Sequence, residues 1–142
     1  GQYSLLSRSK TGSGVEASKG VVRLPSQLQA AIKLYLQVSD PGNSRAALPS
    51  GKQKEVQSEG YVLAQEYAWS HPTDPWAVYI KAYGMSRLFV DLPSDLAKVA
   101  AQLPNKQADL ARRLVAAKIR RDWASFASTE AAIWQDFREL LR

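Results

Sequence analysis

Hydrophobic residues recur along most of the chain at the spacing of an α-helix, and the pattern is densest between Asp74 and Leu92. Asp74 followed by Pro75 is a typical helix start, because an Asp side chain caps free N–H groups and proline fits the first turn. One face of this segment is apolar, and a second face carries Trp76, Tyr79 and Tyr83, followed by Arg87. A helix that is apolar on two sides is buried on two sides. The segment is therefore either the central helix of a bundle or a helix with one face that contacts a protein partner.

The same periodicity predicts five more helices, and no strong strand or internal repeat interrupts them. We expect them at 24–38, 50–70, 94–103, 106–127 and 129–141, the last one capped by Ser128. Short connections between six helices predict an all-α fold, a compact bundle of about five to six helices formed by residues 24–142 as one domain. Residues 1–23 are rich in Ser, Gly and Lys, and we expect a flexible basic arm or linker from a larger chain, with short strands at 2–6 and 21–24.

The net charge of +6 is unevenly distributed. Residues 1–23 contribute +3 and residues 93–127 contribute +4. Positive charge gathered in two segments favours an anionic partner, whereas the alternative is that it serves solubility alone. There is no cysteine, which excludes disulfides and thiolate chemistry. No apolar run approaches the roughly 18–20 residues needed to span a membrane, so we expect no membrane partner. The lack of cysteine fits the cytoplasmic location that we expect, although a periplasmic chain can also lack it.

The predicted fifth helix carries most of the candidate binding residues. Lys106, Arg113 and Arg120 are seven residues apart, so they form one ridge with neighbouring charges roughly 10–11 Å apart. Such a row suits a phosphate backbone, because one arginine side chain can bind two oxygens of a phosphate group, and each neutralised phosphate releases counterions. The alternatives are a solvated face with pairs such as Asp109–Arg113, or a surface for an acidic protein. The candidate nucleic-acid site comprises Lys106, Arg112, Arg113, Lys118, Arg120 and Arg121.

The aromatic row of the central helix is the second candidate site. Trp, Tyr and Arg are favoured anchors of protein interfaces, so we interpret Trp76, Tyr79, Tyr83 and Arg87 as a contact for other protein subunits. Two alternatives remain open, namely an ordinary hydrophobic core and the stacking of nucleic-acid bases.

We find no catalytic residue, no metal site and no cofactor motif. His71 is the only histidine, and with no cysteine it cannot assemble an ordinary zinc site. Glu55, Glu59 and Glu66 fit a solvated helix face better than a catalytic carboxylate pair. We therefore expect a protein that is not an enzyme. An enzyme that uses a carboxylate or tyrosine would need a deep pocket with at least two converging titratable groups.

The combined features predict a non-enzymatic helical subunit that binds a nucleic-acid backbone, largely independently of sequence, within a larger nucleoprotein assembly. In size, charge and helix content the chain resembles the helical small subunits that line nucleic acid in CRISPR effector complexes, although no family motif accompanies this resemblance. The alternative is a protein–protein scaffold or adaptor whose basic face meets an acidic partner. A steep salt dependence would distinguish nucleic-acid binding from the scaffold.

Overall fold

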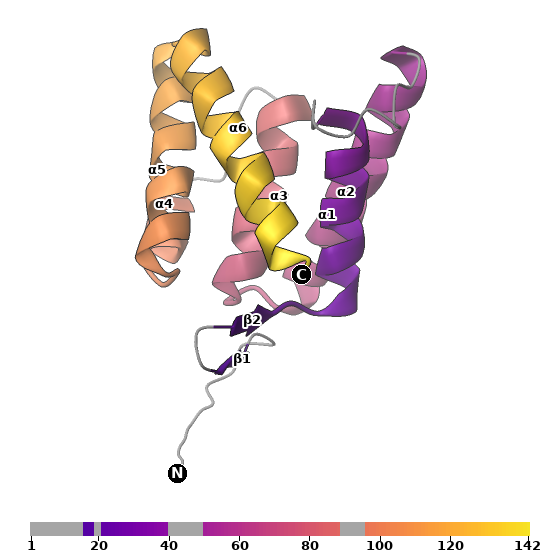
Figure 1. Ribbon diagram of the computed structural model, residues 1–142, viewed down its shortest axis with the longest axis vertical. Helices are drawn as coiled ribbons and strands as arrows, with labels where there is room; N and C mark the ends of the chain where they lie inside the picture. Colours follow the sequence, from indigo (N-terminus) through magenta and orange to yellow (C-terminus); the bar gives the residue numbers. More distant parts are fainter. Residues whose placement is uncertain (1–15, 19–20, 40–49, 89–95) are drawn as a thin grey trace.

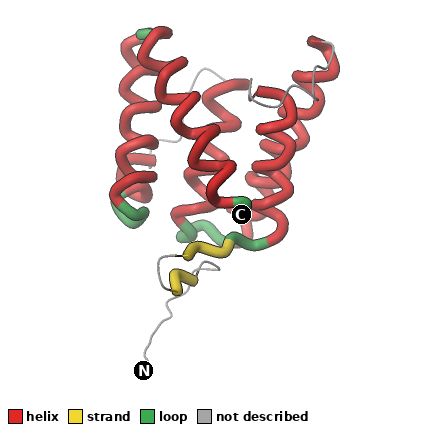
Figure 2. The backbone as a smooth tube through the Cα atoms, viewed as in Figure 1, coloured by secondary structure: helices red, strands yellow, loops and turns green. Residues whose placement is uncertain are grey.

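The computed structural model describes residues 16–18, 21–39, 50–88 and 96–142, and every structural statement below refers to this part of the chain. It is an all-α compact bundle, which confirms the predicted fold class (Figures 1 and 2). The helices are α1 (Ser26–Ser39), α2 (Ser50–Ser70), α3 (Pro75–Leu88), α4 (Leu96–Ala100), α5 (Asn105–Arg120) and α6 (Trp123–Leu140). Two short strands precede them, β1 (Glu16–Ser18) and β2 (Val21–Arg23), and they pair antiparallel with Ala17 opposite Val22.

The helix α3 lies between two helical pairs, which is the first of the two arrangements predicted for this segment, the central helix of a bundle. The pair α1–α2 lies on one side of it and the pair α5–α6 on the other, so that α2 and α5 are at opposite sides of the molecule (Figure 1). The short helix α4 contacts both α3 and α5. The predicted bounds of α2 match the structure, while α4 ends at Ala100, before the predicted end at 103. The predicted start at 94 lies outside the described residues. The strand predicted at 21–24 is confirmed by β2, whereas the one at 2–6 lies outside the described residues.

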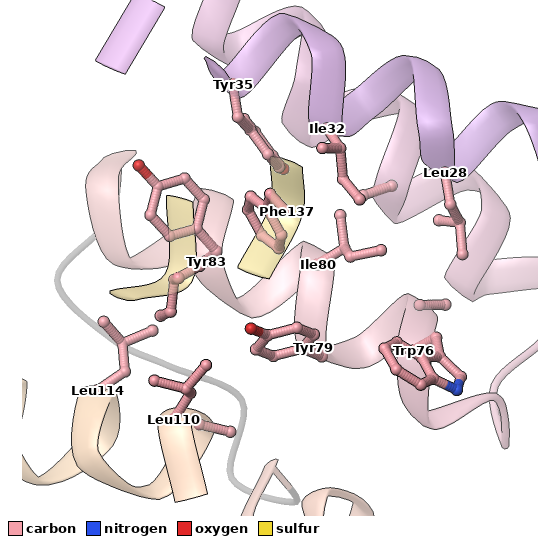
Figure 3. Close-up of a cluster of buried hydrophobic side chains, with 14 of the residues drawn as sticks. Leu28, Ile32, Tyr35, Trp76, Tyr79, Ile80, Tyr83, Leu110, Leu114 and Phe137 are labelled. Carbon is pink, nitrogen blue, oxygen red and sulfur yellow. The ribbon is translucent and has the colours of Figure 1, made fainter. Parts of the chain in front are cut away.

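The core is built mainly from α1, α3, α5 and α6, whose apolar faces meet in the middle of the bundle (Figure 3). Burying a large apolar side chain contributes about 1.5–3 kcal/mol relative to leaving it exposed. This makes the apolar stripes the main determinant of the fold. The stripes consist of Leu28, Ile32 and Tyr35 on α1, Trp76, Tyr79, Ile80 and Tyr83 on α3, Leu110 and Leu114 on α5, and Ile133 and Phe137 on α6.

Two glycines allow the Tyr35 ring of α1 to approach α2 and α3. A Cβ added at Gly60 would lie 2.8 Å from Tyr35 Cε1 and 3.1 Å from the carbonyl oxygen of Ala31. A Cβ added at Gly84 would overlap Tyr35 Oη and lie 3.1 Å from Tyr35 Cζ. Gly60 of α2 and Gly84 of α3 therefore form a notch that receives the Tyr35 ring, and the three helices approach one another closely there.

The boundary between the last two helices differs from the prediction. The predicted helix at 106–127 ends at Arg120, and Arg121 adopts the left-handed conformation with φ 56° and ψ 37°. The backbone N–H groups of Arg121 and Asp122 donate to the carbonyl oxygens of Lys118 and Ala117, which closes α5. Asp122 then caps α6, because its Oδ1 accepts from the Ser125 N–H at 3.1 Å. The predicted cap at Ser128 is wrong.

Candidate functional site

The outward face of α5 carries three of the predicted binding residues. Arg112, Arg113 and Arg120 are all exposed, on the side of α5 that faces away from the core. Arg113 Nη1 lies 3.4 Å from Asp109 Oδ2, with 49% and 62% of the two side chains exposed. Exposed pairs of this kind contribute about 0–1 kcal/mol. A polyanion can therefore compete for Arg113 at small cost.

Lys106 lies at the other end of α5 and is already engaged by α6. Its Nζ is 2.7 Å from Glu139 Oε1 and 3.6 Å from Asp136 Oδ1. The hydrogen bond to Glu139 raises the pKa of Lys106. Lys106 has the predicted seven-residue spacing from Arg113, but its ammonium group connects α5 to α6. It is a weaker candidate for phosphate binding than the arginines.

Lys118 does not flank the outward row, because it points towards α3 and the start of α6. Its Nζ donates to the carbonyl oxygen of Ser86 at 2.6 Å. It also lies 6.0 Å from the centroid of a Trp123 ring and 5.6 Å from that of Phe126. Burial lowers the pKa of the Lys118 ammonium, and the nearby charge of Arg87 lowers it further. Lys118 therefore holds three elements together at this end of the molecule.

We call the turn formed by Ile119, Arg120, Arg121, Asp122 and Trp123 the α5–α6 corner. Both arginines are exposed, and so are 74% of Ile119 and 56% of Trp123. Asp122 is the carboxylate of the corner, and hydrogen bonds from Ser125 lower its pKa, with the charge of Arg120 adding to the effect. Large apolar side chains beside arginines are typical of a binding surface. The corner extends the α5 face onto the first turn of α6.

Sequence reasoning missed Trp123, because it placed this residue inside the last turns of a long fifth helix at 106–127. A signal was available in the sequence. Asp122 is a suitable N-cap residue for a helix that starts at Trp123. The preceding helix has no glycine at its end, where Arg121 stands, so its end is not marked in the usual way.

The predicted protein interface on α3 is not on the surface. Trp76, Tyr79 and Tyr83 are buried, because α6 covers the second face of α3 (Figures 1 and 3). Asp136, Glu130 and Phe137 of α6 contact Tyr79 and Tyr83, and Trp76 packs against Tyr79. Because all three residues are buried, their interpretation as an exposed contact for other subunits is wrong, and the core alternative is correct. Arg87 is partly exposed, but its Nε lies 3.2 Å from Glu130 Oε2.

Two buried carboxylates of α6 bind the tyrosines of α3. Tyr79 Oη donates to Asp136 Oδ2 at 3.0 Å, and Tyr83 Oη donates to Glu130 Oε2 at 2.9 Å. Gln107 Nε2 donates to Asp136 Oδ1 at 2.7 Å. Burial raises the pKa of both Asp136 and Glu130, against these hydrogen bonds and the nearby cations. The pairs satisfy polar groups inside the core, so their arrangement is structural.

Glu130 lies beyond the first turn of α6, because this helix starts at Trp123 and not at residue 129 as predicted. Glu130 and Asp136 were missed as core residues because carboxylates are rarely buried. The available signal was their place at 3–4 residue spacing among Phe126, Ile133 and Phe137.

The described residues contain no group of three or more His, Asp or Glu side chains that could hold a metal ion. None of the described helices combines the length and the apolar character that crossing a membrane requires.

No protein-family model, no curated protein and no solved structure matches this chain. The candidate site must therefore be interpreted from its own chemistry.

Proposed function

We propose that this chain is a non-enzymatic helical subunit that binds the backbone of a nucleic acid through the outer face of α5 and the α5–α6 corner. The binding residues are Arg112, Arg113, Arg120 and Arg121, which are exposed and point away from the core. The observation that supports the proposal best is the excess of cations on this surface. The surface carries four arginines and only two carboxylates, Asp109 and Asp122. Asp122 already accepts a hydrogen bond from Ser125.

Arginine suits this role because its planar guanidinium binds two phosphate oxygens at once and stays charged at any physiological pH. Phosphate contacts position a protein on a nucleic acid without reading its sequence. We therefore propose binding that is largely independent of sequence, in the cytoplasm and within a larger nucleoprotein assembly. Lys106 and Lys118, which hold helices of the bundle together, are secondary contributors.

The test is a titration of fluorescein-labelled oligonucleotides, followed by fluorescence anisotropy at several salt concentrations. If all four arginines contact phosphates, the slope of log K against log salt should be about −3.6 for a duplex and about −2.8 for a single strand. The variant that combines Arg113→Glu and Arg120→Glu should bind at least about tenfold more weakly at low salt. Its far-UV circular dichroism should match that of the unmodified protein, since both residues are exposed.

A matched control separates local contacts from net charge. Lys33 on α1 and Lys54 on α2 are exposed, and these helices lie on the side of the molecule away from α5 (Figure 1). Reversing both to glutamate changes the net charge by the same amount as the arginine double variant. Equal loss of affinity in the two variants, or oligonucleotide binding that survives reversal of the arginines, would contradict the proposed surface.

The second candidate function is a scaffold whose basic face meets an acidic protein. The exposed Ile119 and Trp123 beside the arginines favour it, because interfaces between proteins combine apolar and arginine anchors. The same titration distinguishes the two functions. A chain that binds no oligonucleotide at low salt would favour the scaffold.

A further inference from the structure

Trp123 is an exposed indole that neighbouring side chains hold in place. The Phe126 ring packs edge-on against it, with the ring centroids 5.9 Å apart and the planes at 76°. Lys118 Nζ lies 6.0 Å from the centroid of a Trp123 ring and is itself fixed by its hydrogen bond to the Ser86 carbonyl oxygen. More than half of Trp123 nevertheless remains exposed, at 56%. The indole is thus a supported aromatic surface that is open to solvent.

The charges next to this indole are those of the proposed phosphate site. Arg120 and Arg121 directly precede Asp122 and Trp123, and the left-handed conformation of Arg121 turns the chain sharply between α5 and α6. Phosphate-binding groups and an aromatic ring therefore lie within one tight turn. Proteins that hold single-stranded nucleic acid combine these two elements, a positive surface along the backbone and aromatic rings on which bases stack.

An aromatic ring on the surface distinguishes single strands from duplexes. In a duplex each base is already stacked between its neighbours, so its flat face cannot reach a protein ring unless it is unstacked at a cost. The arginines can bind either form, whereas Trp123 gains a partner only from an unpaired base. The sequence alone gave no preference between the two forms.

We infer that the α5–α6 corner binds single-stranded nucleic acid, with one unpaired base stacked on Trp123 and the adjacent phosphates held by Arg120 and Arg121. This inference rests on the proposed function, because it names the form of nucleic acid that the same surface binds.

The chain provides a matched control in Trp69. This residue is even more exposed, at 83%, but it lies on α2, on the other side of the bundle, with the exposed Glu66 one turn before it. An effect common to all exposed indoles would appear at both positions. An effect that requires the neighbouring arginines would appear only at Trp123.

The experiment compares a labelled oligothymidylate and an oligouridylate of about 12 nucleotides with a hairpin duplex, each titrated with the full chain. The unmodified protein should bind the single strands more tightly than the duplex. Trp123→Ala should weaken single-strand binding about 5- to 150-fold, the range expected for the loss of one stacked base, and leave duplex binding unchanged. Trp123→Phe should retain most of the affinity, and Trp69→Ala all of it.

A second measurement uses the unmodified protein, so it does not depend on the folding of a variant. An abasic oligonucleotide has the same phosphate spacing but no base to stack. It should bind about as weakly as oligothymidylate binds Trp123→Ala, and it should not quench tryptophan fluorescence, whereas oligothymidylate should.

The two proposals fail in different ways. Equal affinity for single strands, duplex and abasic strand, with no effect of Trp123→Ala, would overturn the single-strand inference and leave the proposed function intact. An absence of binding to every oligonucleotide at low salt would overturn both.

Discussion

Replacing Gly84 by alanine should destabilise the bundle, although the same change in an exposed helix is stabilising. Alanine in a helix interior gains up to about 1 kcal/mol over glycine. At Gly84 the new Cβ would overlap Tyr35 Oη and would lie 3.1 Å from both Tyr35 Cζ and Tyr61 Cβ. Overpacking of this kind typically costs about 1–3 kcal/mol. The upper half of that range applies because the Tyr35 ring cannot move away.

The immobility of Tyr35 follows from its neighbours. The ring is buried and packs at 5.1 Å against Tyr83 and at 6.2 Å against Phe137. With the helix gain subtracted, we expect a net loss of about 1–2 kcal/mol. For a chain of this size the melting temperature should fall by roughly 3–8 °C.

Urea denaturation, followed by far-UV circular dichroism at constant pH, measures the effect. Gly51→Ala is the matched control, because nothing lies within 4 Å of its added Cβ. It should be neutral or stabilising by up to about 1 kcal/mol.

Tyr35→Phe tests the mechanism, because it removes the overlapping atom. Tyr35 Oη is buried and has no hydrogen-bond partner in the described part of the chain, so its loss should cost little by itself. Combined with Gly84→Ala, it should recover at least half of the lost stability. A Gly84→Ala protein as stable as the unmodified one, or a double variant with no recovery, would refute this account of the notch.

Two further predictions concern α6 and the corner. Burial raises the pKa of Asp136 and Glu130, so these groups bind protons more tightly in the native state than in the unfolded chain. Their contribution to the free energy of unfolding should therefore increase as the pH falls through the raised pKa values. It should level off near the ordinary carboxyl range, about pH 4. Asp136→Asn removes one of these titrating groups, so the rise of the urea midpoint between about pH 7 and pH 4 should be smaller in the variant. An unchanged pH profile would contradict the assignment. Arg121→Gly should raise stability by about 1 kcal/mol in the same urea assay, because glycine adopts the left-handed conformation without strain, while oligonucleotide affinity should fall. A simultaneous loss of stability and affinity would argue that the Arg121 side chain supports the turn.

Periodicity was sufficient to predict most of the fold, because apolar stripes determine which faces meet. The helix predicted at 24–38 is α1, and its apolar face with Leu28 and Ile32 lies in the core. Arg113 and Arg120 lie outside the core, as the predicted ridge requires. Periodicity was misleading at Arg121, because a left-handed residue that is not glycine leaves little trace in the sequence.

The site was less predictable, because it depends on contacts between helices. A single helix pattern cannot say whether Tyr79 and Tyr83 are covered by α6 or by another protein. Nor can it say that Lys106 reaches Glu139, or that Lys118 reaches Ser86. These partners are 33 and 32 residues away in the sequence, beyond the reach of local spacing.

The hydroxyl–carboxylate pairs between α3 and α6 also determine the register of these two helices. The ridges and grooves of a helix repeat about every turn of 5.4 Å, so the packing of apolar surfaces alone selects weakly against a slide of one turn. Such a slide would separate Glu130 and Asp136 from the tyrosine donors at Tyr83 and Tyr79, so each buried carboxylate would lose a hydrogen bond. The observed alignment of α6 along α3 gives both carboxylates a tyrosine donor, so packings of the same helices that break these two hydrogen bonds are penalised.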